Sequence, residues 1–267
     1  MAIVVGAIKM TGKIGGVVIR YIKSTGKYVA SEYSGPTKSA FKNCKTNLGT
    51  KRGNEDLKAR SIWAKLVRFA TDDLSHLKQG QNNCYIVQIA SQIQNLNKRD
   101  NPGKRSVISS EFNYPLLGYT MNKVHPFKEV FRGDPIVSIS NDRREVTLAL
   151  NNFTSWKKFF WPERVFYYRI YLSISEIPDV VWNENENCFD PVCSKTHRSR
   201  KTVVSEWMGV DTDPIDFKLV ASFAEDYQLS DQTMVMASMG VEFASSILYN
   251  TYCIVPGNGT MAIVGCF

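Results

Sequence analysis

The stretch GKIGGVVIRYIKSTGKYVAS, residues 12–31, decides how the chain begins to fold. Isoleucine and valine flank the short turn Ser24-Thr25-Gly26, a pattern typical of a β-hairpin. We therefore expect three strands in this part of the chain: residues 3–10, 12–22 and 27–31. Gly15-Gly16 inside the second strand predicts a bulge or a close backbone approach, because glycine weakens a regular strand.

A basic, polar segment follows the hairpin. Residues 37–53 contain no acidic residue and few apolar ones, and their basic residues are Lys38, Lys42, Lys45, Lys51 and Arg52. Such a segment cannot bury a core of its own, so we expect an extended basic arm that becomes ordered against another surface. Three roles fit it: a solvated linker, a contact with an acidic neighbouring subunit, or a contact with nucleic-acid phosphates.

Two amphipathic helices are predicted after the arm. The first begins near Asn54, a favoured N-cap residue, and ends at Gly80. Its apolar residues recur three or four positions apart: Ile62, Trp63, Leu66, Val67, Ala70, Leu74 and Leu77. Four basic residues mostly off this stripe join the arm as candidate contacts with another subunit or with phosphate: Lys58, Arg60, Lys65 and Arg68. A second helix over residues 83–96 would complete a helical hairpin.

Short β-prone segments fill the second half of the chain. The predicted strands are residues 136–140, 145–150, 164–175, 202–208, 216–224, 233–243, 247–255 and 260–266. With turn signals between them and no helical period, they indicate an antiparallel β-sandwich, and residues 183–201 are expected to form a long polar loop. The fold class is therefore α+β. The polar run 97–105 marks the predicted boundary between a hairpin, arm and two-helix region (1–105) and the sandwich (106–267).

Charge is divided unequally along the chain. Residues 1–110 carry 19 Lys and Arg against 6 Asp and Glu, a net charge of +13. Residues 111–267 carry 14 against 19, a net charge of −5. This division favours attraction within one molecule, head-to-tail pairing between molecules, or binding of phosphates by the basic part.

No motif carries recognisable catalytic chemistry. The segment 6–14 looks like a phosphate-binding loop, but five residues separate its glycines instead of four, and Ile14 stands where Mg²⁺ needs a hydroxyl. His76, His125 and His197 have no serine or cysteine partner in a nucleophile motif. We therefore expect no enzyme activity, no catalytic residue and no cofactor.

One local group of side chains is able to ligate a metal. Cys188, Cys193 and His197 have the spacing Cys-x4-Cys-x3-His, which is unusual, and a structural zinc site needs a fourth ligand. We expect no metal site on this evidence, and metal binding by these three residues stays open.

The chain shows no sign of membrane insertion or export. No window holds 18 apolar residues, and the apolar N-terminus is short and lacks a preceding basic region, so it is interpreted as a strand instead of a signal peptide. The six scattered cysteines indicate reduced thiols. A cytoplasmic or virion-associated location is expected.

The segment WKKFFWP, residues 156–162, combines two lysines with four large aromatic residues. The four rings that could anchor a protein interface are Trp156, Phe159, Phe160 and Trp161. Two other interpretations remain open: alternate rings face the core of the sandwich, or the rings stack on nucleotides.

Three segments carry a likeness to a known family: TGKIGGVV (11–18), GKYV (26–29) and the helical stretch KARSIWAKLV (58–67). With the basic stretch between them, residues 6–78 resemble a family of unknown function that is widespread in Bacteroidota and their phages. EFASSILY, residues 242–249, is similar to a strand near the end of its members. Residues 51–56 depart from the proline-containing run of the family.

The resemblance implies an architecture and no activity. It implies an N-terminal G-K-I-G hairpin, a basic linker, a helix and an immunoglobulin-like β-sandwich. No catalytic or binding residue comes with it.

The sequence therefore predicts a non-enzymatic, self-assembling structural protein of virion or filament type. The basic N-terminal arm of one copy would dock on the acidic sandwich of the next and build a homo-oligomer or polymer. The alternative is a nucleic-acid-binding module that uses the arm and helix over residues 38–68. A third interpretation is an adhesin-like sandwich that binds through residues 183–201, against which the lack of an export signal counts.

Overall fold

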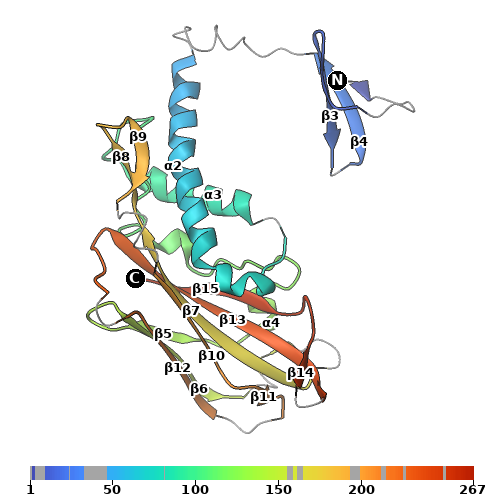
Figure 1. The fold of residues 1–267 in the computed structure, drawn as a ribbon, viewed down its shortest axis with the longest axis vertical. Coiled ribbons are helices and arrows are strands. Elements are labelled where there is room, and N and C mark those ends of the chain that lie inside the picture. Colours follow the sequence, from blue (N-terminus) through green and yellow to red (C-terminus); the bar gives the residue numbers. More distant parts are fainter. Residues whose placement is uncertain are drawn as a thin grey trace. The chain divides into compact units, whose positions relative to one another are not determined.

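The computed structural model describes residues 2–3, 10–23, 25–32, 47–80, 82–154, 159–160, 165–192, 199–211, 215–224, 227–248 and 251–267. They belong to two compact units, Met1–Thr50 and Lys51–Phe267 (Figure 1). The predicted α+β class, with a leading hairpin and antiparallel sheets, is confirmed. The units divide at residue 50, and no division falls at the predicted boundary of residue 105.

The N-terminal unit holds a four-stranded antiparallel sheet in the order β1-β4-β3-β2. Its strands are β1 (Ala2–Ile3), β2 (Gly12–Ile14), β3 (Val17–Ile22) and β4 (Lys27–Glu32). Gly26, with a φ of 66°, makes the turn between β3 and β4 that the hairpin prediction requires. The prediction of a bulge at Gly15-Gly16 is wrong. Ile14 pairs with Val17, so the two glycines turn the chain, and Gly15 supplies the positive φ of 57°.

Three helices lie at the start of the second unit, and the first of them begins three residues before its boundary. They are α2 (Leu48–Ala70), the 3₁₀ helix η2 (Asp72–Leu77) and α3 (Asn83–Leu96). The predicted stripe is buried except for Ile62, which is partly buried against the same core. Because α2 already begins at Leu48, Lys51 and Arg52 are helical, and their assignment to an extended arm is wrong. Lys and Arg are good helix formers, so the helix continues through them. Lys38, Lys42 and Lys45 lie outside the described residues.

Two antiparallel sheets pack face to face in the same unit. The larger has the order β10-β7-β13-β14, with β11 on β7 and β15 on β13, and the smaller is β12-β6-β5. The strands are β5 (Ile136–Ile139), β6 (Glu145–Phe153), β7 (Tyr167–Pro178), β10 (Arg200–Val204), β11 (Met208–Gly209), β12 (Ile215–Ser222), β13 (Thr233–Leu248), β14 (Thr251–Ile254) and β15 (Thr260–Cys266). The predicted sandwich is thus present.

The large sheet is the middle of three layers. Odd-numbered residues of β13, such as Val235 and Phe243, pack toward the small sheet, whereas Met234 and Met236 pack toward the helices. This alternation follows from the period of two along a strand. Figure 1 shows α2 and α3 on one side of the large sheet and β5, β6 and β12 on the other. The strands β7 and β13 are consequently buried on both faces.

The predicted boundary region is fixed to the helices. Asp56 is 4% exposed, and its Oδ1 accepts hydrogen bonds from the backbone N–H groups of Gly103 (3.0 Å) and Arg105 (3.2 Å). The Gln94 side chain donates to the carbonyl of Arg105 at 2.6 Å. The polar run 97–105 is therefore a clamped loop, because its backbone groups find partners on α2 and α3.

The remaining elements connect the layers. They are η3 (Tyr114–Leu116), α4 (Phe127–Val130) and the antiparallel pair β8 (Val180–Asn183) and β9 (Cys188–Pro191). The hairpin corrects the prediction of a continuous loop over residues 183–201. Trp182 and Phe189 pack edge to face across it, with ring centroids 5.0 Å apart.

Candidate functional site

The N-terminal sheet has two chemically different faces. Residues paired directly across antiparallel strands share a face, so the register sorts the side chains. One face, here the apolar face, holds Ile14, Val17, Ile19, Tyr21, Tyr28, Ala30 and, at its end, Glu32. The other, the basic face, holds Lys13, Arg20 and Lys27 among Val18, Ile22, Val29 and Ser31.

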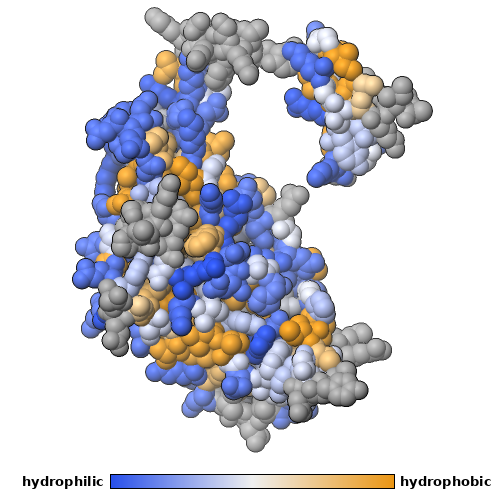
Figure 2. Space-filling view, viewed as in Figure 1, coloured by the Kyte–Doolittle hydropathy of each residue, from blue (hydrophilic) through white to orange (hydrophobic). Residues whose placement is uncertain are grey.

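None of the described residues of this unit buries the apolar face. No side chain of the N-terminal unit whose exposure the structure describes is buried, and Ile14, Val17 and Tyr21 are 58%, 42% and 45% exposed. Figure 2 shows hydrophobic and hydrophilic residues side by side on its surface. Small sheets need a packed apolar face for independent stability. This face is therefore a candidate interaction surface. The sequence alone does not reveal it, because the assignment of side chains to the two faces depends on the turn between β2 and β3.

The basic candidates on α2 serve different purposes. Lys51, Lys58 and Lys65 are seven residues apart, so they follow one stripe of the helix at intervals of about 10 Å. Arg60 lies elsewhere: its Nε donates a hydrogen bond to Gln94, and burial lowers the pKa of its guanidinium. Arg52 packs against Gly103: a Cβ added to Gly103 would lie 3.0 Å from Cγ of Arg52. Arg52 and Arg60 thus support the loop and the helix pair.

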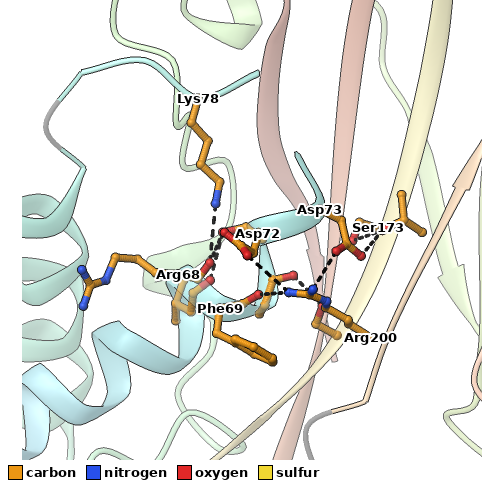
Figure 3. Close-up of polar contacts among 12 residues, drawn as sticks. Arg68, Phe69, Asp72, Asp73, Lys78, Ser173 and Arg200 are labelled. Atoms are coloured by element: carbon orange, nitrogen blue, oxygen red, sulfur yellow. Dashed lines mark hydrogen bonds and ion pairs between the residues drawn. The ribbon is translucent and has the colours of Figure 1, made fainter. Parts of the chain in front are cut away.

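A polar network fastens the C-terminal end of α2 to β10 (Figure 3). The Arg200 guanidinium donates to the carbonyl of Phe69 at 2.9 Å, pairs with Asp73 at 2.9 Å and lies over the Phe69 ring. Thr202 donates to the same Asp73 carboxylate at 3.0 Å. The network joins residues about 130 positions apart, so no local sequence pattern could have indicated it.

Lys78 lies at the edge of this network. Its ammonium donates to the carbonyl of Arg68 at 3.5 Å, while the Arg68 guanidinium points away from it (Figure 3). Burial lowers the pKa of Lys78 to about 8, and the nearby Asp72 opposes the shift. Lys65, Arg68 and Lys78 line one open cavity of about 590 Å³, so two of the predicted basic contacts do come together.

A second cluster surrounds Glu242 on β13. Its Oε2 accepts hydrogen bonds from Arg169 Nε and the Tyr171 hydroxyl, each at 2.8 Å, and Arg169 Nη2 lies 2.6 Å away. His76 Nε2 lies 3.6 Å from Oε1. Burial, reinforced by the hydrogen bond to Glu242, raises the pKa of Tyr171. These side chains line a cavity of about 440 Å³. No local sequence pattern indicates this site, because its members come from three distant segments.

The predicted interface aromatics separate into core and surface residues. Phe159 is 5% exposed and packs against Phe131, Phe153 and Phe243, so its assignment to an interface is wrong. Phe160 is 62% exposed, with the Arg132 guanidinium 5.6 Å from its ring centroid. Trp156 and Trp161 lie outside the described residues. The alternation expected of a core-facing segment therefore holds for the two described rings.

The cysteine cluster is described only in part, since Cys193 and His197 lie outside the described residues. Cys188 Sγ lies 3.0 Å from Asp190 Oδ2 and 3.8 Å from Glu186 Oε2. The hydrogen bond to Asp190 raises the pKa of the Cys188 thiol to about 11. The ligand atoms of Glu186, Cys188 and Asp190 lie within 4.8 Å of one another, a spacing at which they could hold a metal ion, so metal binding at this hairpin stays open.

No family model, curated protein or solved structure matches the chain. The resemblance over residues 6–78 therefore stays a prediction. None of the described helices is both long enough and apolar enough to span a membrane.

Proposed function

We propose that the protein is a self-assembling structural subunit whose N-terminal unit docks on the second unit of a neighbouring copy. The observation that carries this proposal is the uncovered apolar face of the N-terminal sheet. A face of exposed Ile14, Val17 and Tyr21 gains free energy when it is removed from water, at roughly 25 cal/mol per Å² of apolar surface. Exposed apolar patches of this kind mark interaction surfaces.

A second copy is the occupant that charge favours. Residues 1–50 carry eight Lys and Arg and a single acid, Glu32, whereas residues 111–267 have a net charge of −5. Complementary charges steer association and fix its orientation. Docking of one region on a different region of the next copy is a heterologous contact, which produces closed rings or open filaments. Subunits of virions and filaments assemble in this way.

One pair of substitutions tests the surface. Ile14 lies on the apolar face and Ile22 on the basic face, and they are 58% and 37% exposed. We expect Ile14→Lys to shift the sedimentation profile of the full chain from large species to monomer. Ile22→Lys, the matched control, should leave the assembly intact. A wild-type chain that stays monomeric at high concentration and low salt, or an equal effect of both variants, would contradict the proposal.

Nucleic-acid binding is the second candidate, and the lysine stripe on α2 favours it. Lys58 and Lys65 are exposed, and Lys58 forms an ion pair with the half-buried Glu55, at 2.6 Å. Cations spaced along a helix can contact successive phosphates. The test is fluorescence anisotropy of a labelled oligonucleotide titrated with the full chain at several salt concentrations.

Binding through this stripe should weaken steeply as salt rises, because counterions are released from the nucleic acid. The double variant Lys58→Glu/Lys65→Glu should abolish it. The control Lys201→Glu/Lys218→Glu changes two exposed lysines of the sandwich and should have less effect. An absence of binding at low salt would remove this candidate.

A further inference from the structure

The cavity beside Glu242 arises where β13 changes its partner strand. Val241 pairs with Thr260 of β15, and Ala244 pairs with Ile254 of β14, so Glu242 lies at the gap between the two partners. The loop 255–259 crosses this gap, and its Val255 N–H donates to the carbonyl of Phe243 at 2.9 Å. The cavity is therefore built into the strand arrangement, and its volume of about 440 Å³ falls in the usual range of small-molecule sites.

Glu242 presents one oxygen to this cavity. The residue is 5% exposed, and the three close donors from Arg169 and Tyr171 all reach Oε2. Among the contacts of the described residues, Oε1 has His76 Nε2 at 3.6 Å, which is too far for a hydrogen bond. Buried carboxylate oxygens normally accept hydrogen bonds. Oε1 is therefore an acceptor available to a ligand that donates a hydrogen bond.

The surroundings of Glu242 select against a charged ligand. Arg169 is fixed between Tyr171 and Trp207, with its guanidinium 5.1 and 4.6 Å from the two ring centroids. It stays close to the carboxylate, so the pair is charge-balanced. A cation at Oε1 would be attracted less than at a lone carboxylate, because the charge of Arg169 opposes it, and an anion would be repelled by Glu242.

Much of the remaining lining of the cavity is apolar. It includes Leu77, Ile254, Val255 and Pro256. A ligand that fits both parts needs hydroxyl groups that donate and accept hydrogen bonds, together with aliphatic C–H groups that pack against this lining. Cyclic polyols combine the two.

We infer that this cavity binds a small, neutral, polyhydroxylated ligand of monosaccharide size. A ring hydroxyl donates to Glu242 Oε1, and others exchange hydrogen bonds with His76 and Arg169. The C–H face of the ring packs on Ile254 and Pro256. This site is independent of the N-terminal sheet and of assembly.

Saturation-transfer-difference NMR on the full chain tests the inference, because it observes the ligand and tolerates large assemblies. The probes are D-glucose, D-galactose, D-mannose and N-acetyl-D-glucosamine, with glucuronate and glucosamine as charged counterparts. We expect at least one neutral sugar to receive saturation at its ring C–H protons. The charged sugars should bind at least about tenfold more weakly, as the charge argument requires. The absence of a signal from all four neutral sugars, or tighter binding of a charged sugar, would overturn the inference.

Two matched variants locate the site without altering its polar groups. Ile254→Trp fills the cavity mouth and should abolish the signal. Ile136→Trp places the same ring at another exposed isoleucine, on β5, and should leave the signal unchanged. Binding that survives Ile254→Trp lies elsewhere on the protein and would also overturn the inference.

Discussion

At Lys78, burial of the side chain disfavours the positive charge of its ammonium group. Burial of the side chain lowers its pKa from 10.5 to about 8, so folding disfavours the charged form. The cost to stability is fully present below about pH 8 and declines as the pH rises from 8 to 10.5. Above that value the group is neutral in both states. Stability contributed through Lys78 therefore increases with pH in this window.

Replacement of the cation by an isosteric apolar side chain removes this cost. We expect Lys78→Met to stabilise the fold by about 1 kcal/mol at pH 7, a value reduced for the partial exposure of the group and for the lost hydrogen bond to Arg68. Urea unfolding at pH 7 and pH 9.5 measures it, and the gain should shrink at the higher pH. Lys65→Met, at an exposed position of α2, should change stability by less than about 0.5 kcal/mol at both values.

The carboxylate of Asp56 decides whether residues 97–105 behave as a linker or as a clamped loop. Asp56→Ala leaves the backbone N–H groups of Gly103 and Arg105 without their acceptor, which should cost about 2–3 kcal/mol of unfolding free energy. Asp56→Asn keeps one oxygen in place and should cost less than about 1 kcal/mol. Chemical denaturation of both variants distinguishes them. Equal, small effects would show that the loop does not depend on this acceptor.

At the scale of elements, local sequence patterns predicted most of the fold. Residues 83–96 form a helix as expected, because Ile86, Ile89 and Ile93 repeat on one side. The strands of the sandwich also lie close to the predicted positions, since β-prone runs and turn signals act over a few residues.

Predictions failed where distant contacts decide the outcome. The polar run 97–105 has the composition of a linker, but Asp56 and Gln94, which the helix pair brings close to it, hold its backbone in place. The cluster at Glu242 likewise draws a histidine from η2 and an arginine from β7 to a strand whose other residues are mostly apolar. Such sites require the register of the strands, which a single sequence does not supply.

The contact of η2 with the large sheet depends on the absence of a side chain at Gly240. An added Cβ there would lie 2.5 Å from Leu77 Cδ1, and Leu77 is 2% exposed. We expect Gly240→Ala alone to cost about 1–3 kcal/mol through overpacking, and Leu77→Ala alone about 2–5 kcal/mol through a cavity.

The double variant tests whether these two effects share one cause. The new methyl group occupies part of the space that Leu77 leaves, so Gly240→Ala/Leu77→Ala should lose at least about 1 kcal/mol less than the sum of the single losses. Gly259→Ala is a stricter control, because its Cβ would also lie 3.0 Å from the backbone oxygen of Val241. Leu77→Ala should therefore offset less of the destabilisation caused by Gly259→Ala than of that caused by Gly240→Ala. Additive losses for both pairs would show that Leu77 can move aside.

At the scale of the whole molecule, the two units differ in where their stability comes from. The second unit has two buried clusters that include Trp63 and Phe243, whereas the N-terminal sheet has no buried side chain among those described. All five tryptophans lie in the second unit, so tryptophan fluorescence reports on that unit alone.

Hydrogen exchange of residues 17–32 reports on the N-terminal sheet, and it should depend on protein concentration. If the apolar face docks on another copy, the concentration of free docking sites rises as the square root of the total protein concentration above the dissociation constant. Binding then stabilises the sheet by about 0.7 kcal/mol for each tenfold increase in total concentration, and amide exchange slows by about threefold. Mass spectrometry of peptides from this segment measures the effect, with peptides from β7 and β13 as internal references. Ile14→Lys should remove the dependence, while Ile22→Lys should preserve it. Strong protection that stays constant at all concentrations would show that the face is covered without a second copy.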